Sequence, residues 1–95
     1  MLDYRLRTFL TVCKYFNYTK AAKELFITQP AVSQHIRYLE DYFGVPLFFY
    51  SGKTLSLSPA GHLLLQKASA MQNDEILLKE RLKNAGNNIA SIVLE

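Results

Sequence analysis

The side chains best suited to chemistry in this sequence lie between positions 28 and 37, and that chemistry is hydrogen bonding to DNA bases. Glutamine can bind an adenine edge through two hydrogen bonds, arginine suits guanine or phosphate, and serine can take either part. At about 100° per residue, Val32, Ile36 and Leu39 fall on one side of a helix and polar residues on the other. A face that met only solvent would carry Glu and Lys, whereas this one has no acid before Glu40. We therefore expect a recognition helix over about 29–43 that contacts DNA through Thr28, Gln29, Pro30, Ser33, Gln34 and Arg37.

The residues around this face have the spacing of a helix-turn-helix. Thr19 and Thr28 stand nine positions apart, and each can cap the helix that follows it. Pro30 suits a first helical turn, where its missing N–H costs nothing. By spacing alone, an ordinary pair of packed helices fits Tyr18 to Tyr38 as well as a helix-turn-helix does. The polar face of the second helix favours the DNA-binding motif.

The charge distribution of the chain favours an anionic partner. Its 95 residues form one small domain with an appendage, and the 49% hydrophobic share is typical of a globular chain. Seven Lys and Arg against four Asp and Glu lie before Pro59, so the whole net charge of +3 lies in the first part, where a nucleic acid would need it. No apolar run approaches the roughly 18 residues of a membrane span, and no charged-then-apolar leader opens the chain. We expect a cytoplasmic protein without membrane contact.

The sequence has no constellation typical of an enzyme or a metal site. Cys13 is the only cysteine, so it cannot form an internal disulfide, and its helical spacing from Phe9 and Phe16 indicates a buried core thiol. There is no acid–base pair, no metal-ligand spacing and no phosphate-binding loop. His62 should be solvated, and His35 can either contact DNA or pack at the flank of its helix. We expect no catalysis, no metal and no cofactor in this stretch.

Further helices and a β-hairpin complete the predicted DNA-binding domain. Asp3 can cap a first helix with an apolar stripe, and Gly44 is a natural left-handed stop for the recognition helix. The runs 47–50 and 54–57 predict a hairpin around a short glycine-containing loop. Because a lone hairpin is marginal in water, its apolar residues should pack on the helices. The result is a winged helix-turn-helix, in which Lys53 either contacts phosphate or the minor groove or simply keeps the turn soluble.

A long helix follows the wing. Ser58-Pro59 predicts an N-cap with proline at the first helical position, and Gly86 should stop the helix. At ~40 Å it is too long for a small core to cover. Its apolar residues repeat nearly as a heptad, with Glu75 filling one gap. The stripe can be a core face of the same chain, but a helix from a second copy accounts for it better. We expect a homodimer through Leu64, Ala68, Met71, Leu78 and Leu82.

These elements divide the chain into three parts. Residues 1–58 form the winged helix-turn-helix domain, 59–86 the linker and dimerisation helix, and 87–95 a hinge and the opening of a β-strand. That strand has no partner in the sequence, so we expect it to begin a further, effector-binding domain. The fold class is mainly α, with three helices and a hairpin wing followed by the long helix.

One ordered series of residues runs through nearly the whole chain: Phe9, Ala21-Ala22, Leu25, Gln29-Pro30-Ala31-Val32-Ser33, Ile36, Leu39-Glu40, Gly44, Leu47-Phe48, Leu57 and Ala60-Gly61. It resembles the N-terminal part of LysR-type transcriptional regulators. The resemblance implies a winged helix-turn-helix that binds double-stranded DNA, a linker helix that dimerises and a C-terminal effector domain with a periplasmic-binding-protein-like fold. A small-molecule effector would bind in that missing domain, and the full-length protein can also form a tetramer.

Two positions in the wing depart from the family's usual pattern. Tyr50 stands where the family usually has Arg, and Lys53 stands where Arg is frequent. Tyr50 cannot pair with a phosphate as a cation, so the wing either binds more weakly or reads a different feature. Ser58 in place of the usual Thr keeps the helix cap.

The leading hypothesis is a dimeric, sequence-specific DNA-binding regulator of bacterial transcription, with the wing at 47–57 on the adjacent backbone or minor groove. The alternative is a winged-helix module that docks a protein. Such a module would need an aromatic or aliphatic anchor on the exposed face of the recognition helix, and Tyr38 is the one candidate there.

Overall fold

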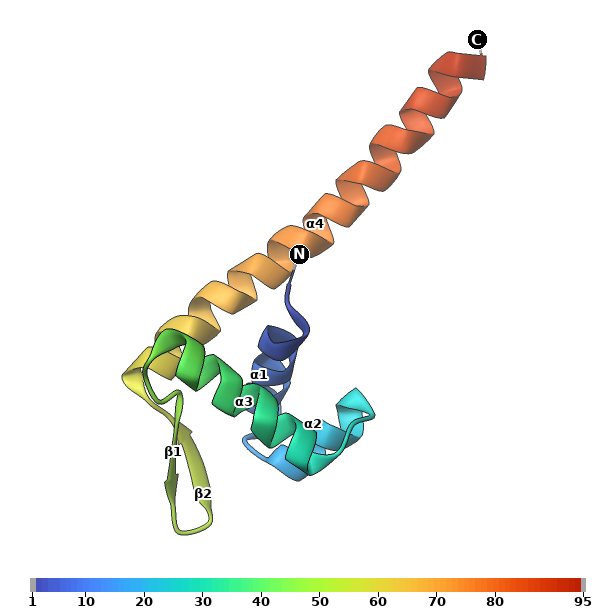
Figure 1. Ribbon diagram of the computed structural model, residues 1–95. Coiled ribbons are helices and arrows are strands. Elements are labelled where there is room, and N and C mark those ends of the chain that lie inside the picture. Colours follow the sequence, from blue (N-terminus) through green and yellow to red (C-terminus); the bar gives the residue numbers. More distant parts are fainter. Residues whose placement is uncertain (1, 95) are drawn as a thin grey trace.

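The computed structural model describes the backbone of residues 2–94 and the side chains of residues 2–87. Three helices and a hairpin form a head at one end of a long final helix (Figure 1), and the molecule measures 65 × 26 × 20 Å. This confirms the predicted fold class. The elements are α1 (Tyr4–Tyr15), α2 (Tyr18–Leu25), α3 (Gln29–Phe43), β1 (Phe48–Ser51), β2 (Thr54–Leu57) and α4 (Pro59–Leu94).

The helices of the head begin at side-chain caps, and one cap differs from the prediction. Asp3 accepts a hydrogen bond from Arg5 N at 2.7 Å, as expected. The cap of α2 is Asn17, whose side chain accepts from Lys20 N at 2.8 Å, so the prediction of Thr19 was wrong. The reason is that α1 ends early in a left-handed residue, Phe16, which turns the chain and leaves Asn17 extended at the capping position.

The core of the head is a cluster of aromatic and aliphatic side chains that all three short helices and the base of the wing share. Phe9, Val12, Val32, Ile36 and Leu47 are almost completely buried. Cys13 is buried beside them, as predicted, and this burial raises the pKa of its thiol from 9.0 to about 12. At about 1.5–3 kcal/mol for each fully buried large apolar side chain, this cluster holds the helices in place without a second chain.

The wing is the predicted hairpin, and its base packs on the core. The strands are antiparallel and pair Phe48 with Leu57 and Ser51 with Thr54, which leaves Gly52 and Lys53 as a two-residue loop. Gly52 has φ +60°, a conformation that the first loop position of a type II′ turn requires. The Phe48 ring contacts those of Phe9 and Tyr18, with centroid distances of 5.4 and 6.4 Å.

Hydrogen bonds fix the base of the wing to α3 and α4. Leu47 N donates to Glu40 Oε2 at 2.7 Å. Ser58 Oγ donates to the Pro46 carbonyl at 2.6 Å and accepts from Gly61 N at 2.9 Å, which confirms Ser58 as the cap of α4. A Cβ atom at Gly61 would lie 2.2 Å from the Leu47 carbonyl oxygen, so only glycine allows α4 to start this close to the wing.

The final helix continues beyond the predicted stop. α4 runs from Pro59 to Leu94 without interruption at Gly86, so both the stop and the β-strand expected over 89–94 were wrong; Glu95 lies outside the described residues. Continuing the helix pairs the backbone N–H and C=O groups of this stretch up to the last turn, whereas a strand without a partner would leave them open. Against that gain, the cost of a helical glycine is only about 1 kcal/mol.

The first half of α4 packs on its own head, which changes the predicted dimer stripe. Ala68 is 1% exposed and Leu64 packs against the core cluster. Glu75, expected in a seam between chains, is mostly buried and lies 3.7 Å from Arg7 Nη2 of α1. Ala68 was therefore wrong as a dimer contact, because the head already covers that side of α4. Leu64 is only partly buried and stays a predicted dimer contact. Met71 remains half exposed, as do Leu78 and Leu82 further along.

Candidate nucleic-acid interface

The N-terminal end of α3 presents the predicted recognition residues at the surface. Thr28 caps the helix by accepting a hydrogen bond from Ala31 N at 3.2 Å, and the opposite side of α3 is anchored in the core through Val32 and Ile36. Because that side is fixed, the polar side cannot turn inward. Thr28, Gln29, Pro30, Gln34 and Arg37 are exposed and Ser33 is partly exposed, so the structure brings them together on one face.

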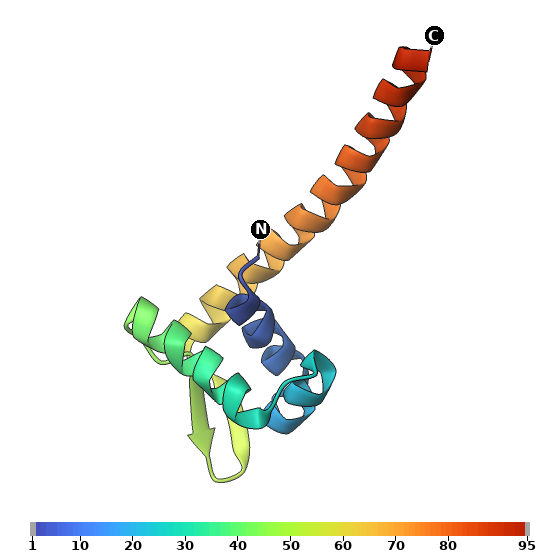
Figure 2. The same ribbon diagram turned by 45° about the vertical axis from the view of Figure 1, so that its right-hand side comes forward.

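The wing lies beside this face. Both the hairpin and the N-terminal end of α3 lie at the end of the head that points away from the C-terminal part of α4, in each of two views (Figures 1 and 2). Lys53 is exposed in the hairpin loop. The hydrogen bonds of Glu40 and Ser58 at the base of the wing hold the loop at a fixed distance from α3.

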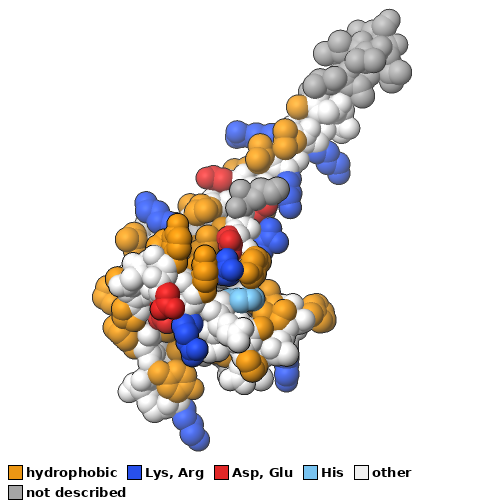
Figure 3. Space-filling model, viewed as in Figure 1, with side chains coloured by type: hydrophobic (Ala, Val, Ile, Leu, Met, Phe, Trp, Pro, Cys, Tyr) orange, Lys and Arg blue, Asp and Glu red, His pale blue; other side chains and the backbone are white. Residues whose placement is uncertain are grey.

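The cations of this surface have no carboxylate partner. Within residues 2–87 the ion pairs join Arg5 to Asp3, Arg7 to Glu75 and Lys14 to Glu24, and none includes Arg37 or Lys53. Figure 3 shows Lys and Arg but no Asp or Glu at the lower end of the head, where the hairpin and the α2–α3 turn lie. Cations without internal partners are available to an anionic ligand.

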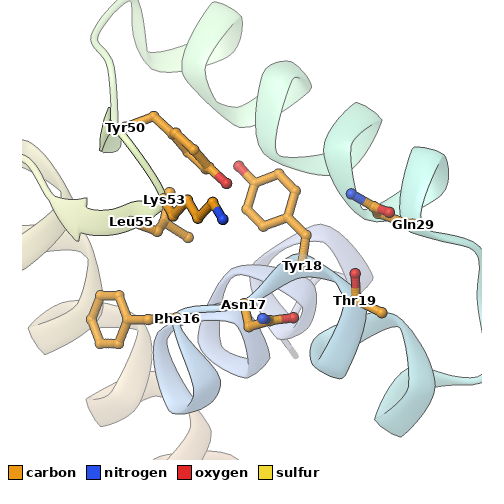
Figure 4. A pocket seen from close by; sticks show the side chains of 8 residues that line it. All are labelled: Phe16, Asn17, Tyr18, Thr19, Gln29, Tyr50, Lys53 and Leu55. Carbon is orange, nitrogen blue, oxygen red and sulfur yellow. The ribbon is translucent and has the colours of Figure 1, made fainter.

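A small cleft separates the wing from the helix-turn-helix. It is a hollow of about 140 Å³, and Figure 4 shows the hydroxyl oxygens of Tyr18 and Tyr50 pointing toward one another, with the Lys53 ammonium group beside them. The lining contains hydroxyls, side-chain amides and one ammonium group, and no carboxylate. Its residues are Phe16, Asn17, Tyr18, Thr19, Gln29, Tyr50, Lys53 and Leu55.

Tyr18 is a cleft residue whose ring is held by packing against the wing. Its ring is partly buried and lies edge-on to Phe48, with an interplanar angle of 78°. Burial, together with the negative charge of Glu40, raises the pKa of its hydroxyl from 10.0 to about 12. At neutral pH the group is therefore protonated and can donate a hydrogen bond. The sequence prediction missed this role, although the aromatic residue at the start of α2 was the available signal.

The structure decides the two alternatives that were open for His35. Its Nδ1 lies 2.8 Å from Thr8 Oγ1, and its ring meets Tyr4 edge-on at a centroid distance of 5.1 Å. His35 thus packs between α3 and α1 at the flank of the recognition face. His62 is exposed on α4, as expected.

Aromatic side chains gather at the other end of α3. The Arg5 guanidinium lies 3.7 Å from the Tyr38 ring centroid, and Tyr38 stacks on Tyr42, which meets Phe43 edge-on. The polar residues and the aromatic residues of α3 therefore occupy different ends of the helix. From the sequence, Tyr38 was the predicted aromatic anchor; Tyr42 and Phe43 join it in the structure.

No helix in the described part of the chain is both long and apolar enough to cross a lipid bilayer. The residues that the structure describes also bring no three His, Cys, Asp or Glu side chains together in a way that could hold a metal ion.

The sequence is similar to known regulators over most of its length. Residues 4–62 match the model of a family described as bacterial regulatory helix-turn-helix proteins, lysR family. The chain is 42% identical over 79 residues to the HTH-type transcriptional regulator YybE of Bacillus subtilis (strain 168), covering 83% of this chain and 27% of that protein. It is 44% identical over 66 residues to CysL of the same organism, covering 70% and 22%. The chain spans about a quarter of the length of the curated relatives it matches.

Solved structures show the same arrangement of elements. A transcriptional regulator of the LysR family from Eggerthella lenta DSM 2243 is 62% identical, with a TM-score of 0.68 and coverage of 73% of this chain and 99% of that one. The CbnR DBD–DNA complex gives a TM-score of 0.80 at 29% identity, covering 87% and 95%. The BenM DBD complex with catB site 1 DNA gives 0.83 at 29% identity, covering 87% and 93%.

Proposed function

Because the chain belongs to the LysR family of bacterial regulatory helix-turn-helix proteins, we propose that it binds double-stranded DNA at specific sequences and regulates transcription. The N-terminal end of α3 enters the major groove, and the wing lies on the adjacent backbone or minor groove. Gln29, Ser33 and Gln34 read base edges. Arg37 and Lys53 supply positive charge to bases or phosphates.

One observation carries this proposal: an exposed, acid-free face at the start of α3 includes Arg37 and lies beside Lys53, and neither cation has a carboxylate partner among residues 2–87. Two similar solved structures are DNA complexes of the CbnR and BenM proteins, which supports the same use of this fold here. A protein-docking face would need an aromatic anchor among the recognition positions. The exposed aromatic rings of α3 lie at its other end instead, from Tyr38 onward.

The proposal includes pairing of two chains along α4. Beyond the head this helix leaves apolar side chains about half exposed, among them Met71, Leu77, Leu78 and Leu82. Burying them against a second copy gives on the order of 1.5–3 kcal/mol each at full burial. Two heads related by a two-fold axis can then read two half-sites at a fixed spacing.

A longer chain of the family adds regulation to this activity. For a protein of the length of the curated relatives, we assign residues 1–58 to DNA binding and the following helix to linkage and dimerisation. A small-molecule effector would act through a C-terminal domain that lies after residue 95. The site of action is the DNA of the cytoplasm.

The test begins with selection of duplexes from a random pool by the wild-type chain. Gln29→Ala and Ser33→Ala should relax base preference by about 1–3 kcal/mol per lost bidentate contact, as measured against mismatched duplexes. Lys53→Ala is the matched contrast: it should weaken binding to selected and random duplexes alike and lower the logarithmic salt slope by about 0.9.

Two results count against these assignments. If an alanine variant discriminates between duplexes as well as the wild type does, that residue does not read bases. If the wild type prefers no sequence in the pool, the proposed function is wrong.

A further inference from the structure

The cleft between the wing and the helix-turn-helix lies where a duplex would have to pass one of its strands. If α3 enters the major groove and the wing meets the adjacent minor groove, the sugar–phosphate strand that divides the two grooves runs between them. The cleft is lined on one side by Gln29 at the start of α3 and on the other by Tyr50 and Lys53 of the wing (Figure 4). This inference rests on the proposed function.

The chemistry of the lining suits a phosphate. Protein contacts to DNA phosphates come from cations and from hydroxyl, amide and N–H donors, and the cleft offers Lys53 together with the hydroxyls of Tyr18, Thr19 and Tyr50. No carboxylate lines it. At about 30 Å³ for each water, a hollow of about 140 Å³ has room for a group the size of several waters.

We propose that this cleft holds one DNA phosphate, with the Tyr18 and Tyr50 hydroxyls donating hydrogen bonds to its oxygens and Lys53 supplying the charge. The two tyrosines come from different elements, α2 and β1, so a shared phosphate ties the wing to the helix-turn-helix and sets the register of the duplex. Tyr50 thereby contacts the backbone as a neutral donor in place of a cation.

Two features of the tyrosines support this assignment. The Tyr18 ring is held against Phe48, so its hydroxyl is already oriented, and as a phenol it is a hydrogen-bond donor at neutral pH. The charged groups that act on Tyr18 include Arg37 and Glu40 of α3. Tyr50 is 73% exposed, so its hydroxyl is open to a ligand.

The experiment couples a change in the protein to a change in the DNA. Selected duplexes are synthesised with one phosphate at a time replaced by an uncharged methylphosphonate, and each is bound by wild type, Tyr18→Phe and Tyr50→Phe. One replacement beside the major-groove site should weaken wild-type binding about tenfold, as expected for a hydrogen bond to a charged group. In either phenylalanine variant the same replacement should cost less, because one of the contacts to that phosphate is already lost.

The salt dependence separates a hydroxyl contact from a charge contact. Tyr50→Phe should leave the logarithmic salt slope unchanged, whereas Tyr50→Arg should steepen it by about 0.9. Tyr42→Phe is the matched control, since Tyr42 is an exposed tyrosine of α3 outside the cleft and should keep the wild-type profile.

Several outcomes overturn the inference. If the wild type binds specifically and both phenylalanine variants keep its methylphosphonate profile, no phosphate sits in the cleft and the proposed function stands. If the wild type selects no duplex, both the proposed function and this inference are wrong. Thermal melting checks the fold of Tyr18→Phe, and the exposed Tyr50→Phe gives the answer independently if Tyr18→Phe is unstable.

Discussion

Apolar side chains are buried in the head and exposed in the distal part of α4, residues 76–87. In the head, Phe9 and Val12 have no exposed surface, because three helices and the base of the wing close around them. In the distal part of α4, Leu78 and Leu82 are 52% and 62% exposed, and Figure 3 shows hydrophobic side chains lying between charged ones along this helix. Both regions are helical, so helix formation is not what separates them.

This difference in burial indicates that the head folds within one chain and that the distal part of α4 needs a partner to bury its apolar side chains. The head satisfies its hydrophobic face and its cap hydrogen bonds within one chain. Residues 76–87 of α4 pair their backbone within the helix but leave apolar side chains such as Leu78 and Leu82 exposed, which is the condition under which a second helix can pack. Substitutions of buried residues should therefore destabilise the head, whereas substitutions of exposed apolar residues in α4 should separate paired chains.

The largest expected effect is in the core of the head. Phe9→Ala should lower the free energy of unfolding by about 3–5 kcal/mol, a large part of the 5–15 kcal/mol that is usual for a domain, as measured by denaturant melts. Phe26→Ala is the same chemical change at a ring that is 95% exposed, and it should stay within about 0.5 kcal/mol of wild type. Equal losses in the two variants would show that the core is not where the stability lies.

A smaller effect on folding and a large effect on assembly are expected in α4. Leu82→Asp places a charge on the exposed apolar surface beyond the head, so it should separate paired chains while the head keeps its melting behaviour. Sedimentation at tens of micromolar measures this, and Asn84→Asp, which adds a carboxylate at an exposed polar position, is the control. A wild-type chain that stays monomeric at that concentration would remove α4 as the dimer contact.

The effect that is smallest near neutral pH is a loss of head stability that sets in only at alkaline pH. The folded chain keeps the Cys13 proton up to a pKa of about 12, whereas an ordinary thiol loses it near 9.0; Tyr18 does the same between 10.0 and about 12. The folded state thus binds more protons in this range, so unfolding becomes easier as pH rises. Between neutral pH and pH 9 these two groups should leave the free energy of unfolding unchanged, and above pH 9 it should fall as first Cys13 and then Tyr18 contribute.

Cys13→Ala gives the control for this pH profile. Without the thiol, the fall in stability should begin only near pH 10, where Tyr18 alone remains. An unchanged onset at pH 9 in Cys13→Ala would show that another group causes the alkaline loss.

Most of the elements, and most of the surface that we assign to DNA, could be predicted from local sequence. The caps at Asp3, Thr28 and Ser58, the stop at Gly44 and the hairpin around Gly52 depend on local chemistry, and each was predicted from neighbouring residues. The exposed side of α3 followed from the 3.6-residue period alone, because the apolar residues of one helix fix which side faces water.

The features that depend on segments far apart in the chain could not be predicted from local sequence. The assignment of Ala68 to the head instead of a dimer seam required the position of α1. The packing of His35 required Thr8, 27 residues away. The cleft of Tyr18 and Tyr50 exists because the wing folds back beside α2, and no local pattern records such a contact. A sequence period reports which side of a helix is apolar, but what covers that side is set by how the elements pack.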